Sequence, residues 1–397
     1  MKKMMKLSLV AAVAVAGFST SASASSMENA IKNTTIGGYV RYRFNDTYSD
    51  AANSDSSSEQ VKVLATIKSK VNDNVTAVVQ GLAVNGQDNG EVVHYSDATT
   101  GNTVGGMDVS AANFVYTNGA ASVTVGLQAL ATPWTDAADG ARANGVLGTY
   151  NLGSVTLAAA YFRDSRQGGD KNANIDANEL GAVAAIGKAG PVSYQAWYLK
   201  ISSIATDGTA NGAGSSLAQG GDAVALLANA KFGPVAVDAS YASLDGDDLP
   251  DKQTLSKVVV TGDLGVATLV GGYAVGGKDG DLVTFDPDAK VGFESPVAVR
   301  AGKGGQYDLD AYTAAVVVPV GAVAIKAQYT DATYYSATVH TALNEMEVDE
   351  SLIQVSYKMS KNFSSYVRYA MVDYNKNAET AGNADKDVAR IELKYTF

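Results

Sequence analysis

The segment Ile36–Asn45, with the sequence IGGYVRYRFN, alternates between two kinds of side chain. The even-numbered positions are Ile36, Gly38, Val40, Tyr42 and Phe44. The odd-numbered positions include Tyr39, Arg41, Arg43 and Asn45. We call each such set of alternate positions a parity. Successive side chains of a β-strand point to opposite faces, so this segment is predicted to be a strand with an apolar face and a charged face. Such a strand separates two unlike environments.

The same separation recurs along the chain. In Val61–Lys70 the three lysines share one parity, and in Ala389–Phe397 the charged residues alternate with Ile391, Leu393 and other apolar residues. Asp308 with Asp310 also keeps to a single parity. We therefore expect about 18 strands of roughly ten residues each, the even number and the length typical of outer-membrane barrels.

The connections between these strands are of two kinds, which alternate along the chain. Short turns such as Gly233-Pro234 are followed by long polar loops such as 277–305. Alternation alone also fits a soluble β-sandwich, but a sandwich has no reason to sort its connections in this way. The pattern predicts an all-β fold, a transmembrane antiparallel β-barrel with short periplasmic turns and long extracellular loops.

The charged parity is expected to face water inside the barrel. An unpaired charge in a dry core is very unfavourable, whereas barrels of 16 to 18 strands leave an aqueous lumen. The residues predicted to line this pore are Arg41, Arg43, Lys62, Lys68, Asp238, Asp308, Asp310, Arg368, Arg390 and Glu392.

The first 24 residues have the pattern of a cleaved secretory signal peptide. Three lysines precede the apolar run Leu7–Phe18, and Ala22-Ser23-Ala24 provides a cleavage site. The run is too short to span a bilayer, so residues 25–397 are predicted to form one barrel domain. Removing these lysines changes the net charge from −11 to −14, and an acidic chain disfavours nucleic acid as a partner.

Few residues offer catalytic chemistry. The chain has no Cys, and its two histidines, His94 and His340, stand far apart in predicted loops. No Ser/His/Asp set is recognisable, and the Gly-rich stretch Gly276–Asp281 lacks the strand and helix of a phosphate-binding loop. We do not expect an enzyme.

Several segments resemble the major outer-membrane porins of Campylobacter-type bacteria. They are Glu28–Lys32 with Gly38–Phe44, Trp134–Gly140, Leu157–Ala159 with Asp164-Ser165, and the closing Arg390–Phe397. The resemblance implies an outer-membrane homotrimer of eighteen-stranded, mainly cation-conducting diffusion pores whose loops narrow the lumen. Phe397, with Tyr395 before it, also resembles the C-terminal signal by which bacterial barrels are recognised for insertion.

A calcium ion is a further expectation. The loop Asp170–Glu179 places oxygen ligands at alternate positions, but Ile175 replaces the glycine of an EF-hand and Gly181 replaces its bidentate Glu. In the family that this chain resembles, aspartates hold calcium near the constriction, and Asp139 and Asp170 match them by position. A solvated Asx-rich turn is the alternative. No other cofactor is expected.

Three classes of function stay open at this point. The leading hypothesis is a passive diffusion channel for ions and small hydrophilic solutes, surrounded by outer-membrane lipid, with a ligand-selective channel close behind it. The second is a barrel with a plugged lumen that acts mainly as an adhesin or structural protein. The third is a soluble exported β-protein.

Overall fold

The computed structural model describes most of the chain after the predicted signal peptide. The described residues are 32–51, 55–86, 107–137, 141–166, 179–202, 220–247, 249, 251–286, 288–336, 345–375, 377 and 383–397. The predicted signal peptide lies outside these residues and stays a prediction. No helix within them is long and apolar enough to cross a membrane.

Twenty strands make up the described structure. In chain order they are β1 (Thr34–Ser49), β2 (Ser56–Lys70), β3 (Val75–Gly86), β4 (Met107–Asn118), β5 (Ala121–Ala129), β6 (Arg142–Asn151), β7 (Val155–Arg166), β8 (Leu180–Ala189), β9 (Val192–Ile201), β10 (Gly221–Phe232), β11 (Val235–Gly246), β12 (Gln253–Asp263), β13 (Thr268–Gly276), β14 (Phe293–Glu294), β15 (Arg300–Ala301), β16 (Gln306–Val320), β17 (Val323–Ser336), β18 (Glu345–Tyr357), β19 (Phe363–Tyr374) and β20 (Lys386–Thr396). Eighteen of them form one sheet, and β14 pairs only with β15.

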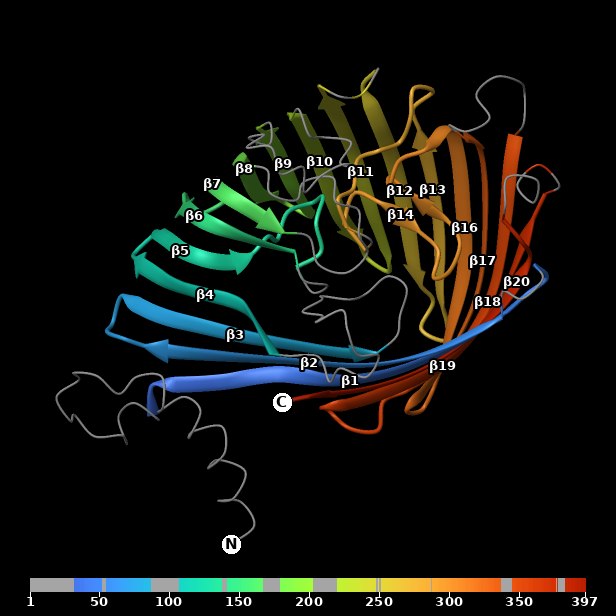
Figure 1. Cartoon of the computed structure of the whole chain (residues 1–397), viewed down its shortest axis with the longest axis horizontal. Helices are drawn as coiled ribbons and strands as arrows, with labels where there is room; N and C mark the ends of the chain where they lie inside the picture. Colours follow the sequence, from blue (N-terminus) through green and yellow to red (C-terminus); the bar gives the residue numbers. More distant parts are fainter. Residues whose placement is uncertain are drawn as a thin grey trace, which may run out of the picture.

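The large sheet closes on itself. Each strand is antiparallel to its neighbours, and β1 pairs with both β2 and β20. At the seam, the amide and carbonyl of Gly38 exchange two hydrogen bonds of 3.0 Å with those of Phe397. The result is an edgeless cylinder, which pairs the backbone groups that hydrocarbon cannot satisfy (Figure 1). The predicted eighteen-stranded barrel is therefore confirmed.

The two ends of the barrel differ in their connections. At the turn end, consecutive strands are joined by short connections such as the pair Gly233-Pro234 between β10 and β11. Gly233 and Gly321 have φ angles of 60° and 63°, a left-handed conformation that favours glycine in tight turns. The long connections lie at the other end, which we call the loop end.

The outward face of the barrel is apolar, with a band of tyrosines whose hydroxyl groups donate to carboxylates. The pairs are Tyr48–Asp46, Tyr161–Glu179, Tyr198–Asp222, Tyr273–Asp310, Tyr329–Asp349, Tyr335–Glu345 and Tyr369–Asp387. All lie toward the loop end of their strands. Aromatic girdles mark the two interfaces of membrane barrels, so this band indicates where lipid headgroups meet the loop end.

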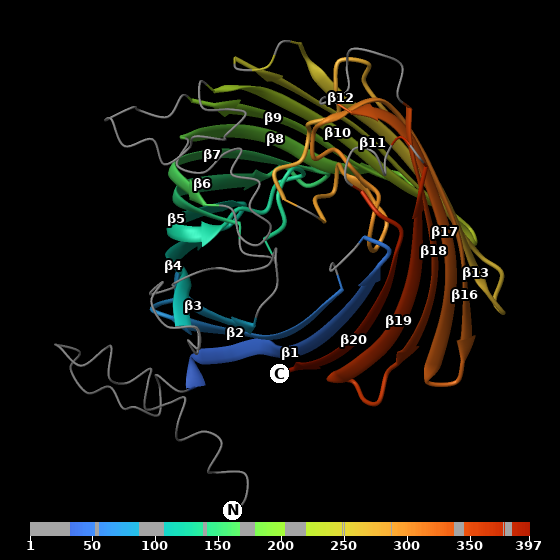
Figure 2. The ribbon, with the colours of Figure 1, turned by 45° about the vertical axis from the view of Figure 1, so that its right-hand side comes forward.

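The inside of the barrel is partly filled. The segment 277–305, which joins β13 to β16 and contains β14 and β15, folds into the ring of strands (Figure 2). Its Val283 and Phe285 are fully buried, and they belong to one apolar cluster with inward residues such as Ala223 and Ala225 of β10. Small side chains on the wall leave room for this segment at the loop end. We call 277–305 the inward segment.

The lumen and its inward segment

One side of the lumen wall is basic. Arg41 and Arg43 of β1 and Lys62 of β2 point inward, and at most 9% of each is exposed. The Nη2 atom of Arg43 lies 2.9 Å from Oε2 of Glu392 on β20, and Arg41 donates to Oε1 of Gln60 over 2.5 Å. These four charged residues were predicted to face inward, and they cluster where β1 meets β2 and β20.

A second group of cations lies beside the first. Arg390 of β20 is directly opposite Asn45 on one side and Arg368 of β19 on the other; Arg368 is opposite Gln354 of β18, which is opposite Lys326 of β17. All three cations are partly exposed. We call Arg390, Arg368 and Lys326, together with Asn45 and Gln354, the cation row.

Neutral amides orient the two arginines of this row. The Nε atom of Arg390 donates to Oδ1 of Asn45 over 2.5 Å, and that of Arg368 donates to Oε1 of Gln354 over 2.9 Å. The guanidinium of Arg368 also lies 5.1 Å from the ring centre of Tyr366. An amide acceptor fixes the direction of a guanidinium without neutralising its charge.

Two other predicted residues also lie on the inward face. Lys68 is exposed near the turn end of β2, with the same parity as Lys62. Asp238 of β11 lies opposite Asn229 of β10, whose side-chain amide donates to it. Together with the residues above, they place eight of the ten predicted lining residues on the inward parity.

The prediction that Asp308 and Asp310 line the pore is wrong, because neither side chain faces the lumen. Both are exposed, and Asp310 accepts a hydrogen bond from the hydroxyl of the outward-facing Tyr273. The inward positions of this stretch of β16 belong to Leu309 and Ala311, which are fully buried.

The physical reason is the local environment of β16 at the loop end. There the inward segment makes the interior dry, so apolar residues point inward, while the carboxylates point out beside the tyrosine band. An irregularity in the pairing with β17, between Tyr307 and Asp310, accompanies this arrangement. Where the interior is dry, parity alone does not decide whether a charged residue points inward.

Three charged residues anchor the inward segment to the barrel. Glu350 of β18, 1% exposed, accepts hydrogen bonds from the hydroxyl of Ser295 and from the amides of Val297 and Ala298, the last two over 3.0 and 2.8 Å. Lys257 of β12 donates to the carbonyls of residues 290 and 292 over 2.5 Å. The segment is thereby tied to two separate parts of the wall.

The third anchor, Asp281, belongs to the segment itself. Its carboxylate accepts the amides of Gly302 and Gln306 over 2.6 and 3.2 Å. Burial raises the pKa of Asp281 to about 6, although these amide donors favour the charged form and lower its pKa. The carboxyl holds together the start and the end of the inward segment.

A second loop, which connects β5 to β6, packs against the inward segment. The carbonyl of Trp134 accepts the amide of Phe285 over 2.8 Å, and Asp286 accepts the amide of Asp136 over 2.9 Å. The ring of Trp134 is fully buried and meets that of Trp197 of β9 edge to face, with centroids 6.4 Å apart. Two loops distant in sequence thus form one packed unit inside the barrel.

Sequence reasoning did not single out Glu350, Lys257 or Asp281. One signal was available for Glu350, since parity places it between the apolar inward residues Val348 and Leu352. A charge flanked by apolar neighbours on an inward face indicates a buried partner. The partner itself is distant in sequence, so local patterning does not identify it.

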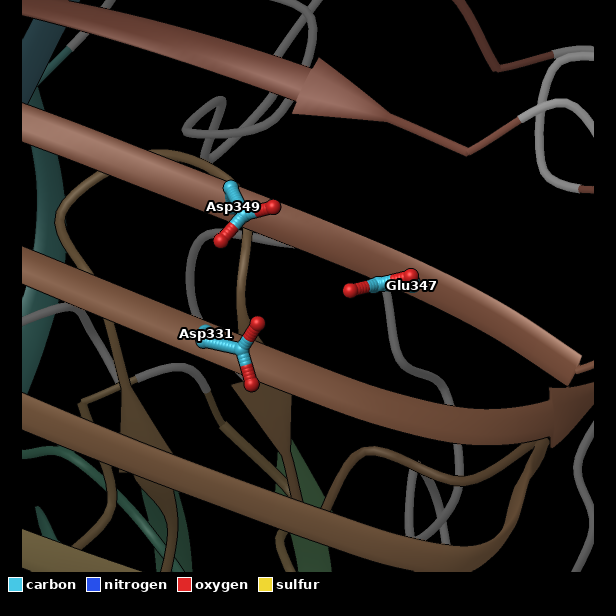
Figure 3. Close-up of side chains that lie close together, drawn as sticks. All are labelled: Asp331, Glu347 and Asp349. Carbon is cyan, nitrogen blue, oxygen red and sulfur yellow. The ribbon is translucent and has the colours of Figure 1, made fainter.

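Possible metal ligands are a separate matter. The predicted calcium ligands Asp139 and Asp170 lie outside the described residues, and that site stays a prediction. Within the described part of the chain, Asp331 of β17 and Glu347 and Asp349 of β18 place carboxylate oxygens within 4.8 Å of one another (Figure 3). They share the outward parity of Tyr329, so this cluster lies on the outer wall and not in the lumen.

The fold and the lumen together define the class of protein. A closed barrel with an apolar outer wall, a charged inner wall and a loop folded into its lumen is an outer-membrane barrel of the porin type. The model of the Campylobacter major outer membrane protein family matches residues 1–397. The chain belongs to that family.

Solved structures show the same fold at low sequence identity. OpdQ of Pseudomonas aeruginosa is 12% identical with a TM-score of 0.69, covering 92% of this chain and 99% of that one. OccK2 of the same organism is 9% identical with a TM-score of 0.70, and OccAB4 of Acinetobacter baumannii is 13% identical with a TM-score of 0.66, each covering 92% of this chain and 98% of its own. No curated protein sequence matches.

Proposed function

We propose that this porin is a passive channel for ions and small hydrophilic solutes. The observation that carries the proposal is the cation row: its charges are partly exposed on the inner wall of a barrel whose outer wall is apolar. Charges held this way require water beside them, and a hydrated path through the barrel follows. We further propose the homotrimer that the family resemblance implies.

Conductance of the purified protein in a planar bilayer tests this function. We expect discrete current steps in salt solution, and permeation of a small uncharged sugar alcohol into proteoliposomes. A barrel that inserts stably but passes neither ions nor the sugar alcohol would contradict the proposal. That result would favour the alternative, an adhesin or structural barrel plugged by its packed loops.

The second part of the proposal is a weak preference for cations. The net charge of −11 attracts cations to the channel as a whole. Selectivity, however, depends most on charges close to the permeating ion, and the basic side of the wall opposes the overall field. We therefore expect a cation-to-anion permeability ratio only modestly above one.

Replacing Arg41 and Arg43 together by alanine should raise that ratio by about two- to threefold, since two positive charges leave the lumen wall. The reversal potential in a salt gradient measures the change. The outer-wall variant Lys200→Ala serves as the control, because Lys200 pairs with Asp222 outside the barrel over 3.0 Å. An unchanged ratio in the double variant would remove both arginines from the conducting path.

A further inference from the structure

Asp281 lies where the two ends of the inward segment meet. Its carboxylate accepts the backbone amides of Gly302 and Gln306, and the side-chain amide of Gln306, oriented by its hydrogen bonds, donates to Oδ2 over 3.0 Å. Next to it, the carbonyl of Gly302 accepts the amides of Val283 and Thr284, both over 2.7 Å. One carboxyl therefore closes the segment at the place where it leaves the barrel wall and returns to it.

The surroundings of Asp281 are tightly packed. A methyl group built on Gly276 of β13 would lie 2.9 Å from Cβ of Leu309 on β16 and 3.1 Å from Cβ of Asp281. Gly302 has a φ angle of 106°, a conformation that favours glycine, and its amide reaches the carboxylate over 2.6 Å. Asp281 itself is 0% exposed. In the packed segment its carboxyl is therefore kept away from bulk water.

No positive charge compensates this carboxyl. Within the described part of the chain, no cation forms an ion pair with Asp281. From β12 the neutral Gln253 packs beside the segment, and Tyr334 of β17 interacts with Asp281 electrostatically. A buried carboxyl without a counter-charge favours its neutral, protonated form. The charged side chains closest in sequence to these contacts are Asp251, Lys252, Lys278, Asp279, Arg300, Lys303 and Asp308.

We propose that Asp281 is a proton-operated latch, which holds the inward segment packed in acid and lets it loosen at neutral pH. While the segment is packed, the carboxyl is dry and binds a proton readily. When the segment loosens, water reaches the carboxyl, which then ionises like any exposed aspartic acid. Proton uptake therefore accompanies packing, and acid favours the packed form. Only the effect of the latch on ionic current rests on the proposed channel function.

The pKa of Asp281 gives the direction and the size of the effect. Burial raises this pKa to about 6 in the packed segment, from the ordinary 3.8. Between these two values only the packed form carries the proton, so each pH unit changes the packing equilibrium by up to about tenfold. Lowering the pH from 7 to 4 should therefore shift the equilibrium toward the packed form by about a hundredfold.

A spin label on the inward segment tests the latch without relying on conduction. The chain has no cysteine, so Lys290→Cys provides a single attachment point for a nitroxide. Lys290 is an exposed residue in the middle of the segment. In the full barrel we expect the mobile fraction of the label spectrum to fall as the pH is lowered from 7.5 to 4.5. Single-channel conductance should fall over the same range.

Asp281→Asn removes the titration but keeps an oxygen that accepts the backbone amides. In this variant we expect the label to show, at pH 7.5, the low mobility that the unaltered carboxyl gives only in acid, and to lose its response to pH. Asp308→Asn is the matched control, because Asp308 is an exposed carboxyl beside the same segment, where its amide donates to the carbonyl of Gly277 over 3.0 Å. We expect this control to respond to pH as the unaltered residue does.

The outcomes separate the latch from the channel. A label spectrum that does not change with pH when Asp281 is present would refute the latch, and this measurement does not depend on the folding of Asp281→Asn. A response that persists in a folded Asp281→Asn variant, as judged by its mobility in detergent gels before and after heating, would refute it as well. If the label responds as expected but the protein passes no current at any pH, the latch stands and the channel function has failed.

Discussion

Replacing Glu350 by alanine is expected to release the inward segment from β18 and to raise single-channel conductance. The change removes the acceptor for the Ser295 hydroxyl and for the amides of Val297 and Ala298 in a buried place. Donors left without an acceptor there cost about 3 to 5 kcal/mol in total, enough to detach this part of the segment. Single-channel recording measures the conductance, and limited proteolysis measures access to residues 295–298.

Glu350→Gln separates the lost charge from the lost acceptor. Its amide oxygen still accepts hydrogen bonds, so we expect most of the anchoring and a conductance near that of the unaltered protein. If alanine leaves both conductance and protease resistance unchanged, Glu350 does not hold the inward segment. Equal effects of both substitutions would indicate that the charge matters more than the hydrogen bonds.

Replacing Trp134 by alanine should give the second large effect. A fully buried indole is removed from between the two interlocked loops, and a cavity of this kind costs about 3 to 5 kcal/mol. Because Trp134 packs on Trp197 of β9, we expect the loop unit to loosen while the barrel stays closed. Fluorescence of the remaining Trp197 and hydrogen exchange of residues 283–286 measure the change.

Trp134→Phe is the matched control. Among the described residues, none is a hydrogen-bond partner of the Trp134 indole nitrogen, so phenylalanine loses volume but no polar contact seen there. We expect a much smaller loss of protection than in the alanine variant. Unchanged hydrogen exchange in the alanine variant would show that the loops hold together without this ring.

The barrel could be predicted from the sequence because the alternation of apolar and charged residues is a local property of each strand. The parity of Arg41 and Arg43 against Val40 and Phe44 is a property of ten consecutive residues, and the same alternation defines strand after strand. The turns were predictable for the same reason. Parity alone also predicted the face that Lys62 and Arg390 occupy, and the structure places both on the inward face of the barrel.

The loop-end interior was not predictable in this way. Asp308 and Asp310 carry the same local signal as the lumen charges, yet they face outward because the inward segment fills the space beside β16. Glu350 accepts hydrogen bonds from groups 52 to 55 positions away in the chain. Lys257 donates to carbonyls 33 and 35 positions away. The alternation of residues within one strand does not predict such a long-range hydrogen bond.

The seam between Gly38 and Phe397 has a consequence for how the molecule is made. The strand that closes the cylinder, β20, is the last strand of the barrel in the sequence, and its partner β1 is the first. Contacts between residues so far apart in the chain form slowly. Until they form, both edge strands expose unpaired backbone groups that invite association with other chains. We therefore expect the polypeptide to reach the membrane with both edge strands present but unpaired, before the seam between them closes.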